Sequence, residues 1–244
     1  MRGHRKGKFM VFRDEQVWCR LPGAYDVWSW SCTQQGFYDL RMLAIRLKDG
    51  QLLIWSPIAS ASEEALAALD KLGKVGAMVE PNHFHHLGVE PFRKRYPRAA
   101  LVAHDSAIPR LQRVTRSEFQ SLSALQPLLP DGLHLAGPEG LKQGETWLWS
   151  ERRGSDPGFL VVGDSYLNMT SPKNFLVDKA FRMTGSYPGL KLTKVFRFVA
   201  FADQVRFRTW VDDFQRRHQP TVLIPSHGDL YESPSLGQEL VSLI

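Results

Sequence analysis

The chain has 244 residues, of which 43% are hydrophobic and 23% are charged, and its formal net charge is +6. This length and composition predict a globular protein with one large domain over residues 1–244, including an N-terminal extension over residues 1–35 whose packing the sequence does not define. No apolar run reaches the roughly 20 residues that cross a bilayer. The basic start Met1–Lys8 leads into Phe9–Trp18, where charged residues interrupt any apolar signal segment. We therefore expect a cytoplasmic protein without a membrane partner.

Basic residues are spread along the chain, with the densest groups at Arg2–Lys8 and Arg93–Arg95. Aromatic residues do not interleave regularly with these charges, as stacking platforms for nucleic acid require. A charged terminus and a solvated helix face account for both groups. Nucleic-acid binding is therefore not expected, and it stays only as a third hypothesis.

The first half of the chain predicts a hairpin followed by alternating helices and strands. Residues Arg41–Leu47 and Leu52–Pro57 are apolar and β-prone, and the Asp49-Gly50 pair between them is typical of a hairpin turn. The capping-box pattern Ser60–Glu63 predicts the start of a helix that ends before Gly73. The elements expected next are a strand over Val75–Glu80, a helix over Val89–Arg95 and a strand over Ala99–His104.

The second half returns to β character after a polar middle region, Asp105–Gln126. Apolar residues at helical spacing predict one long helix within Phe201–Arg217. Hairpins followed by alternating strands and helices indicate an α/β protein with its functional residues on loops at strand ends. The strands expected in this half are Leu133–Leu135, Thr146–Ser150, Phe159–Gly163 and Thr221–Pro225.

Three of the eight histidines, His83, His85 and His86, fall within four consecutive residues directly after a predicted strand. A turn at this point can bring several imidazoles toward one metal ion, and imidazole binds zinc, iron and manganese. Asp164 and His227 also follow apolar strands, so each is a further candidate ligand. Isolated histidines are more often surface or hydrogen-bonded core residues, but clustering favours metal binding here.

These residues resemble the metallo-β-lactamase superfamily. The segment Asn82–Gly88 is similar to a degenerate form of the motif His-x-His-x-Asp-His-x-Gly, and Gly163-Asp164 and Pro225–Gly228 follow in the family's order. The stretch from Arg41 to Pro97 is similar, more specifically, to the DUF4336 branch of that superfamily. The resemblance implies an α/β fold, an αβ/βα four-layer sandwich of two mixed sheets flanked by helices.

The resemblance also shows where this chain departs from the family motif. With Leu87-Gly88 as the anchor, Pro81 and His83 take the positions of the first two histidines, His85 takes that of the aspartate and His86 that of the last histidine. One of the family's two metal positions is therefore reduced to His83.

Two further family ligands are replaced, because Leu141 and Ser56 stand where the superfamily has a histidine and a strand-end aspartate. The resemblance thus implies one divalent ion, with zinc favoured over iron or manganese. It leaves His83 and Asp164 as the candidate catalytic residues. The implied metal ligands are His85, His86, Asp164 and His227.

On this basis we expect a metal-dependent hydrolase that acts on a small-molecule ester, thioester, amide or phosphoester. The alternative, which the replacements at Pro81, Leu141 and Ser56 favour, is a non-catalytic ligand- or metal-binding protein on a degenerate metallo-β-lactamase fold. The sequence does not define the substrate or the oligomeric state. Large aromatic residues such as Trp30 and Trp55 are more typical of a core than of a pocket wall.

Overall fold

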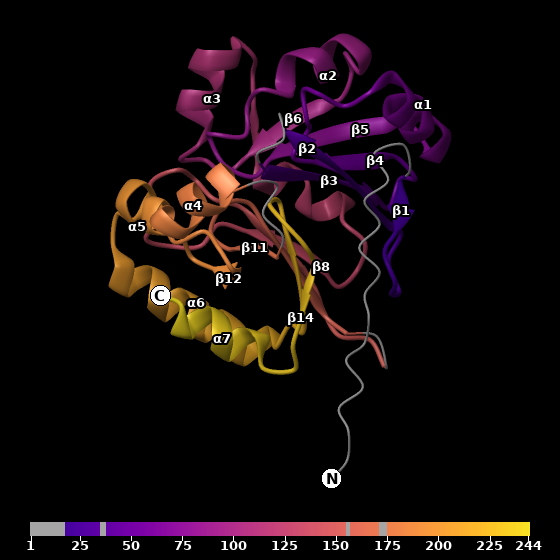
Figure 1. Cartoon of the computed structure of the whole chain (residues 1–244). Coiled ribbons are helices and arrows are strands. Elements are labelled where there is room, and N and C mark those ends of the chain that lie inside the picture. Colours follow the sequence, from indigo (N-terminus) through magenta and orange to yellow (C-terminus); the bar gives the residue numbers. More distant parts are fainter. Residues whose placement is uncertain (1–17, 35–37, 155–156, 171–174) are drawn as a thin grey trace.

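The computed structural model describes residues 18–34, 38–154, 157–170 and 175–244, and its elements form four layers (Figure 1). Two β-sheets pack face to face, and helices cover the outer face of each sheet. The N-terminal half, indigo to magenta in Figure 1, builds one sheet with its helices, and the C-terminal half builds the other. This arrangement confirms the predicted four-layer α/β sandwich of two mixed sheets.

The first sheet has seven strands and changes from antiparallel to parallel pairing at β4. Pairs from β1 to β4 are antiparallel, whereas β4, β5, β6 and β7 run parallel. The carboxyl ends of the parallel strands therefore meet at one edge of the sheet. In sheet order the strands are β1 (Cys19–Arg20), β2 (Val27–Gln34), β3 (Tyr38–Arg46), β4 (Leu52–Trp55), β5 (Val75–Glu80), β6 (Ala100–Ala103) and β7 (Gln120–Ser121).

The second sheet has five strands, of which β10 and β13 are the parallel pair. A separate two-stranded sheet is formed by β11 (Leu167–Met169) and β12 (Gly189–Lys191). In sheet order the strands of the five-stranded sheet are β14 (Tyr231–Glu232), β13 (Val222–Pro225), β10 (Phe159–Val162), β9 (Trp147–Ser150) and β8 (Leu133–Ala136).

The helices fall into an N-terminal and a C-terminal group, which lie on opposite sides of the sandwich in Figure 1. The first group is α1 (Glu63–Leu72), α2 (Val89–Arg95) and α3 (Ile108–Thr115), followed by the short 3-10 helices η1 (Leu122–Ala124) and η2 (Gln126–Leu128). The second group is α4 (Phe175–Thr184), α5 (Lys194–Ala200), α6 (Gln204–His218) and α7 (Leu236–Ser242).

Alternating side chains along the strands produce the layers. In β5, Met78 packs under the first group of helices, whereas Val79 packs between the two sheets. In β10, Val161 joins Val79 between the sheets, and Leu160 packs against the second group of helices. Successive side chains of a strand point to opposite faces, so each strand supplies two apolar layers.

The predicted hairpin, the strands and the helices at Val89–Arg95 and within Phe201–Arg217 are confirmed, with ends displaced by a few residues. The start of α1 differs from the prediction. Its N-cap is Ser62, whose Oγ accepts a hydrogen bond from the Ala65 backbone N–H at 3.2 Å, so the predicted capping box at Ser60 is wrong by two residues.

The described part of the N-terminal extension belongs to the first sheet, because β1 and β2 pair with each other and β2 pairs with β3. Trp30 of β2 and Trp55 of β4 are 2% and 1% exposed, which confirms the prediction that these side chains are core. Trp28 packs against the same core and carries Arg46 over its ring.

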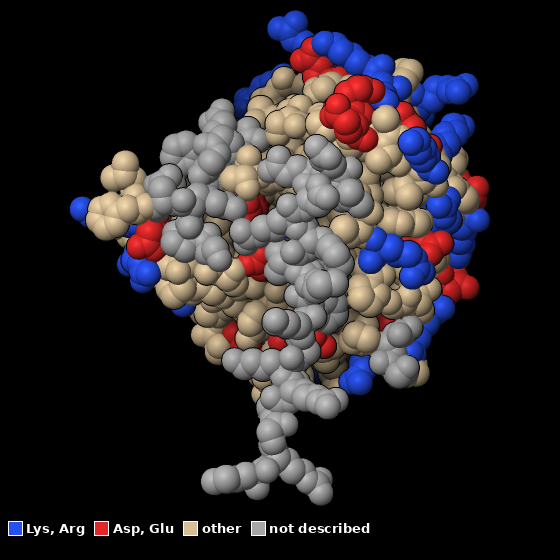
Figure 2. All heavy atoms as spheres, turned by 45° about the vertical axis from the view of Figure 1, so that its right-hand side comes forward, with Lys and Arg blue, Asp and Glu red and all other residues tan. Residues whose placement is uncertain are grey.

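The surface charges are mixed. Figure 2 shows Lys and Arg along the top and the right edge of the view, with Asp and Glu between them. On α2 the basic residues have acidic neighbours, since Lys94 pairs with Glu90 at 2.8 Å and Arg95 pairs with Asp70 at 2.6 Å. Within the described part of the chain, no helix has both the length and the apolar character needed to span a membrane.

Glu80 ends β5 as a fully buried carboxyl group, and neither of its oxygens has a hydrogen-bond partner among the described residues. Residues two apart in a strand share a face, so Glu80 points with Met78 toward the first group of helices. Burial raises the pKa of Glu80 well above its ordinary value of 4.5. The folded protein therefore keeps a proton that the unfolded chain releases, and its stability falls as the pH rises above that ordinary value.

We predict that Glu80→Gln removes this pH dependence. The free energy of unfolding of the variant relative to the wild type should increase with pH from 4.5 upward, by at most about 1.4 kcal/mol per pH unit. Denaturant unfolding at several pH values measures this slope. Glu118→Gln, which changes an exposed carboxyl group, is the control, and a parallel pH response of the two variants would contradict the assignment.

Candidate metal centre

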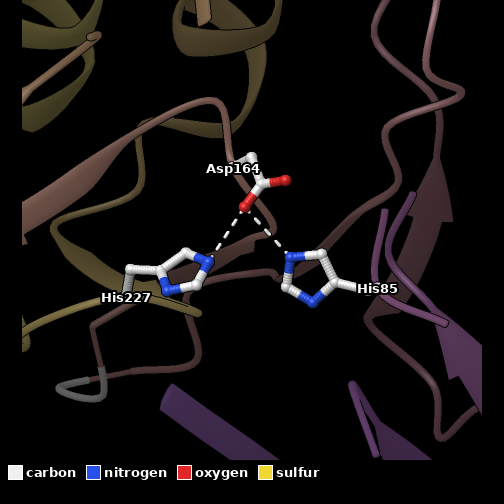
Figure 3. A group of neighbouring side chains, drawn as sticks. All are labelled: His85, Asp164 and His227. Carbon is white, nitrogen blue, oxygen red and sulfur yellow. Dashed lines mark hydrogen bonds and ion pairs between the residues drawn. The ribbon is translucent and has the colours of Figure 1, made fainter. Parts of the chain in front are cut away.

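Three of the predicted site residues meet at one point (Figure 3). Oδ1 of Asp164 lies 3.0 Å from Nε2 of His85 and 2.9 Å from Nε2 of His227. One potential ligand atom from each residue lies within 4.8 Å of the others. The three side chains follow β5, β10 and β13, so both sheets contribute to the group.

The hydrogen bonds of His227 favour a positive charge in this group. Its Nδ1 lies 3.3 Å from the backbone oxygen of Asp39, which can only accept, so this contact is a hydrogen bond when Nδ1 carries the hydrogen. In that tautomer Nε2 faces the carboxylate oxygen of Asp164 at 2.9 Å as a second acceptor. A second proton on the ring or a bound cation then stabilises the contact. A metal-binding histidine usually donates its other N–H to a carbonyl or carboxylate, as His227 does.

His85 is held by Ser56. The Oγ of Ser56 lies 2.8 Å from Nδ1 of His85 and leaves Nε2 directed at Asp164. Ser56 has a φ of 56°, a left-handed conformation that is uncommon for residues other than glycine. Burial alone lowers the pKa of His85, but the charge and the hydrogen bond of Asp164 raise it above its ordinary value. Ser56 thus orients a candidate ligand.

Asn82 fixes both the turn that carries His85 and the carboxylate of Asp164. Its Oδ1 accepts a hydrogen bond from the Phe84 backbone N–H at 2.8 Å, and its backbone oxygen accepts one from His85. Its Nδ2 donates to Oδ2 of Asp164 at 2.9 Å and to Oε2 of Glu145 at 3.1 Å. Asp164 therefore has one oxygen bound by Asn82 and the other facing the two histidines.

Glu145 is a buried carboxylate that shapes the loop after β10. Its oxygens accept hydrogen bonds from the backbone N–H groups of Gly163, Asp164 and Ser165 at 3.0, 3.3 and 3.0 Å. Burial and the neighbouring charge of Asp164 raise the pKa of Glu145. Burial also acts to raise the pKa of Asp164, but His85 and His227 lower it well below its ordinary value. Asp164 is therefore the ionised carboxylate that faces the two rings.

Arg41 positions the loop that carries His227. Its guanidinium donates to the backbone oxygen of Pro225 at 3.2 Å and to that of Gly228 at 2.7 Å, one on each side of the histidine. Gly228 has a φ of 89°, and a Cβ at this position would lie 2.2 Å from the backbone oxygen of Asn168. A larger residue does not fit there, so glycine is required beside the histidine.

The other two predicted histidines lie on the same turn but outside the group of three. His86 directs Nδ1 to the backbone oxygen of His83 at 3.3 Å. His83 is half-buried and contacts the ring of Phe84, with centroids 4.3 Å apart. Burial lowers the pKa of His83, as do the charges of Arg110 and His86.

Several solved metallo-β-lactamases have a similar arrangement of elements. One from Erythrobacter litoralis, with β-mercaptoethanol in the active site, aligns over 93% of this chain and 94% of its own, with a TM-score of 0.58 and 15% identity. FIM-1 from Pseudomonas aeruginosa in its mono-zinc form aligns over 93% and 92%, with a TM-score of 0.57 and 11% identity. The chain has the metallo-β-lactamase fold. No protein-family model and no curated protein matches the sequence.

A third neighbour, the metallo-β-lactamase from Pontibacter korlensis, aligns over 93% of this chain and 98% of its own, with a TM-score of 0.51 and 13% identity. At identities this low the similarity concerns the fold, and activity must be argued from the site itself.

We predict that Asn82→Ala weakens metal binding about 10- to 100-fold, because Asp164 and Glu145 lose the amide that lies between them. Titration of the metal-free protein with zinc measures this affinity. The matched control is Ser150→Ala, which removes a buried hydrogen bond from the Phe159 backbone N–H at the opposite end of β10. Equal zinc affinities in the two variants would contradict the role of Asn82.

Proposed function

We propose that the protein is a metal-dependent hydrolase with one divalent ion held by His85, Asp164 and His227. The observation that carries this proposal is the convergence of His85, Asp164 and His227, each of which offers one potential ligand atom within 4.8 Å of the others. Two imidazoles and a carboxylate suit zinc best, with iron or manganese as alternatives.

The donor set also fits a catalytic site better than a closed structural one, because three protein ligands leave a coordination position open. When bound, a divalent ion supplies Lewis acidity and lowers the pKa of water, so that a strong nucleophile is available at neutral pH. Asn82 and Glu145 hold the Asp164 carboxylate in place, and Ser56 orients His85. His83, whose pKa burial lowers, stays the candidate acid–base residue.

The proposed substrates are small-molecule esters, thioesters, amides or phosphoesters. The alternative is a non-catalytic binding protein on the same fold, and the absence of donor side chains at Pro81 and Leu141 favours it. Cytoplasmic location and membership of the DUF4336 branch stay predictions.

We predict that the purified wild type holds about one zinc, iron or manganese ion per chain, and that His227→Ala and Asp164→Ala lose it. Elemental analysis of untagged protein measures the content. The control is His134→Ala, since His134 pairs with the carboxylate of Glu151 at 3.0 Å but does not belong to the group of three. A folded, metal-free wild type that takes up no added ion would contradict the proposal.

His86→Ala tests the fourth ligand that the sequence predicts. Loss of the ion in this variant would support a four-ligand site, which requires the side chain of His86 to turn from its present position. Retention of the ion would limit the protein ligands to His85, Asp164 and His227.

Hydrolysis is the direct test of the enzymatic part of the proposal. The zinc-loaded wild type should hydrolyse at least one chromogenic ester, thioester, amide or phosphoester, and His227→Ala should lose at least about 100-fold in kcat/KM, as expected when a catalytic ion is removed. His134→Ala should keep its activity. A wild type that binds the ion stoichiometrically but turns over no substrate class favours the non-catalytic alternative.

A further inference from the structure

A large apolar cavity opens beside Asp164 and His227. Its volume is about 440 Å³, which is in the range of small-molecule sites in proteins. Aromatic and aliphatic side chains from three elements form most of its wall, among them Met169 of β11, Phe181 of α4 and Phe196 of α5. This wall suits a hydrocarbon chain or an aromatic ring.

A second cavity of about 250 Å³ shares lining residues with the first. Asp164 and His227 line both cavities, and so does Phe84, whereas Ser56 and His85 line only the smaller one. The candidate metal centre therefore lies between two spaces. A substrate that spans both would place its central bond at Asp164 and His227.

Charge distinguishes the substrate classes. Among the described residues that line the two cavities there is no Lys or Arg. Phosphate and carboxylate groups are usually bound by such cations, by backbone N–H groups or by metal ions. The described part of the wall of the larger cavity is mostly apolar and favours an uncharged group.

Gln143, which lines the larger cavity, holds a buried acceptor without a partner among the described residues. Oε1 of Gln143, a residue that is 1% exposed, has no hydrogen-bond partner among the described residues. The hydroxyls of Thr193 and Ser186, which also line the cavity, have partners in Phe196 and Thr184. A buried acceptor without a partner costs free energy, and a donor group on a ligand would remove that cost.

We propose that the substrate is an uncharged carboxylic ester, thioester or amide whose apolar acyl chain fills the larger cavity. The scissile carbonyl lies at Asp164 and His227, a neighbouring N–H or O–H group donates to Gln143, and the leaving group occupies the smaller cavity. This assignment rests on the proposed hydrolase function and narrows its substrate class by setting phosphoesters aside.

The binding test uses methyl ketones, which carry an uncharged carbonyl and are not hydrolysed. Calorimetry with the zinc-loaded wild type should show an affinity that rises about fourfold for each added methylene from 2-butanone to 2-decanone, until the chain fills the cavity. Phe181→Ala, which removes part of the wall, should lower the affinity for 2-decanone at least about fivefold and change the affinity for 2-butanone by no more than about twofold.

Phe198→Ala is the matched control, because Phe198 lies on α5 but is 88% exposed and does not line the cavity. It should bind both ketones as the wild type does. A wild-type affinity that is independent of ketone chain length overturns the proposal. So does an equal loss of 2-decanone affinity in Phe181→Ala and Phe198→Ala.

Hydrolysis separates this inference from the proposed function. Among p-nitrophenyl esters, kcat/KM should rise from acetate to octanoate and exceed that for bis(p-nitrophenyl) phosphate at least about tenfold. Faster hydrolysis of the phosphodiester overturns the substrate class and leaves the hydrolase function standing. Chain-length-dependent ketone binding without hydrolysis of any ester, thioester, amide or phosphoester supports the cavity assignment and contradicts the proposed function.

Discussion

A half-buried carboxylate between two imidazoles is the constraint on which the site depends. Asp164 stays ionised because His85 and His227 lower its pKa far enough to outweigh burial. The backbone oxygen of Asp39 accepts from His227 when the hydrogen is on Nδ1, and the other ring nitrogen then faces the carboxylate as an acceptor. A second proton on the ring or a bound cation provides the positive charge that stabilises this contact.

The fold provides this arrangement by bringing strand ends together. The carboxyl ends of β4 and β5 in one sheet, and of β10 and β13 in the other, carry Ser56, His85, Asp164 and His227. The apolar layer between the sheets holds these strands in place. Glu145 then connects the sheets, because the amide of Asn82 after β5 and the backbone after β10 both donate to it. Packing and buried polar contacts thus act on the same loops.

The sequence predicts the strands that precede the site, β4, β5, β10 and β13, and the three residues of the group, because each of these residues follows an apolar run that can be recognised locally. It does not predict how Asn82 joins Asp164 and Glu145, since these residues are 82 and 63 positions away in the chain. Glu145 gives no local signal beyond one charge before an apolar strand. The sequence also does not predict helix α5. The apolar residues of this helix form no single helical stripe, and one of them, Phe198, is exposed.

The most direct test of a cation between His227 and Asp164 is anomalous diffraction at the zinc edge from crystals of the zinc-loaded protein. The account predicts one strong peak about 2.0–2.2 Å from Nε2 of His85, Oδ1 of Asp164 and Nε2 of His227. A peak only at another histidine, such as His134 beside Glu151, would contradict it. A map without any peak would also contradict it, because a proton on His227 would then be the only positive charge between the two acceptors.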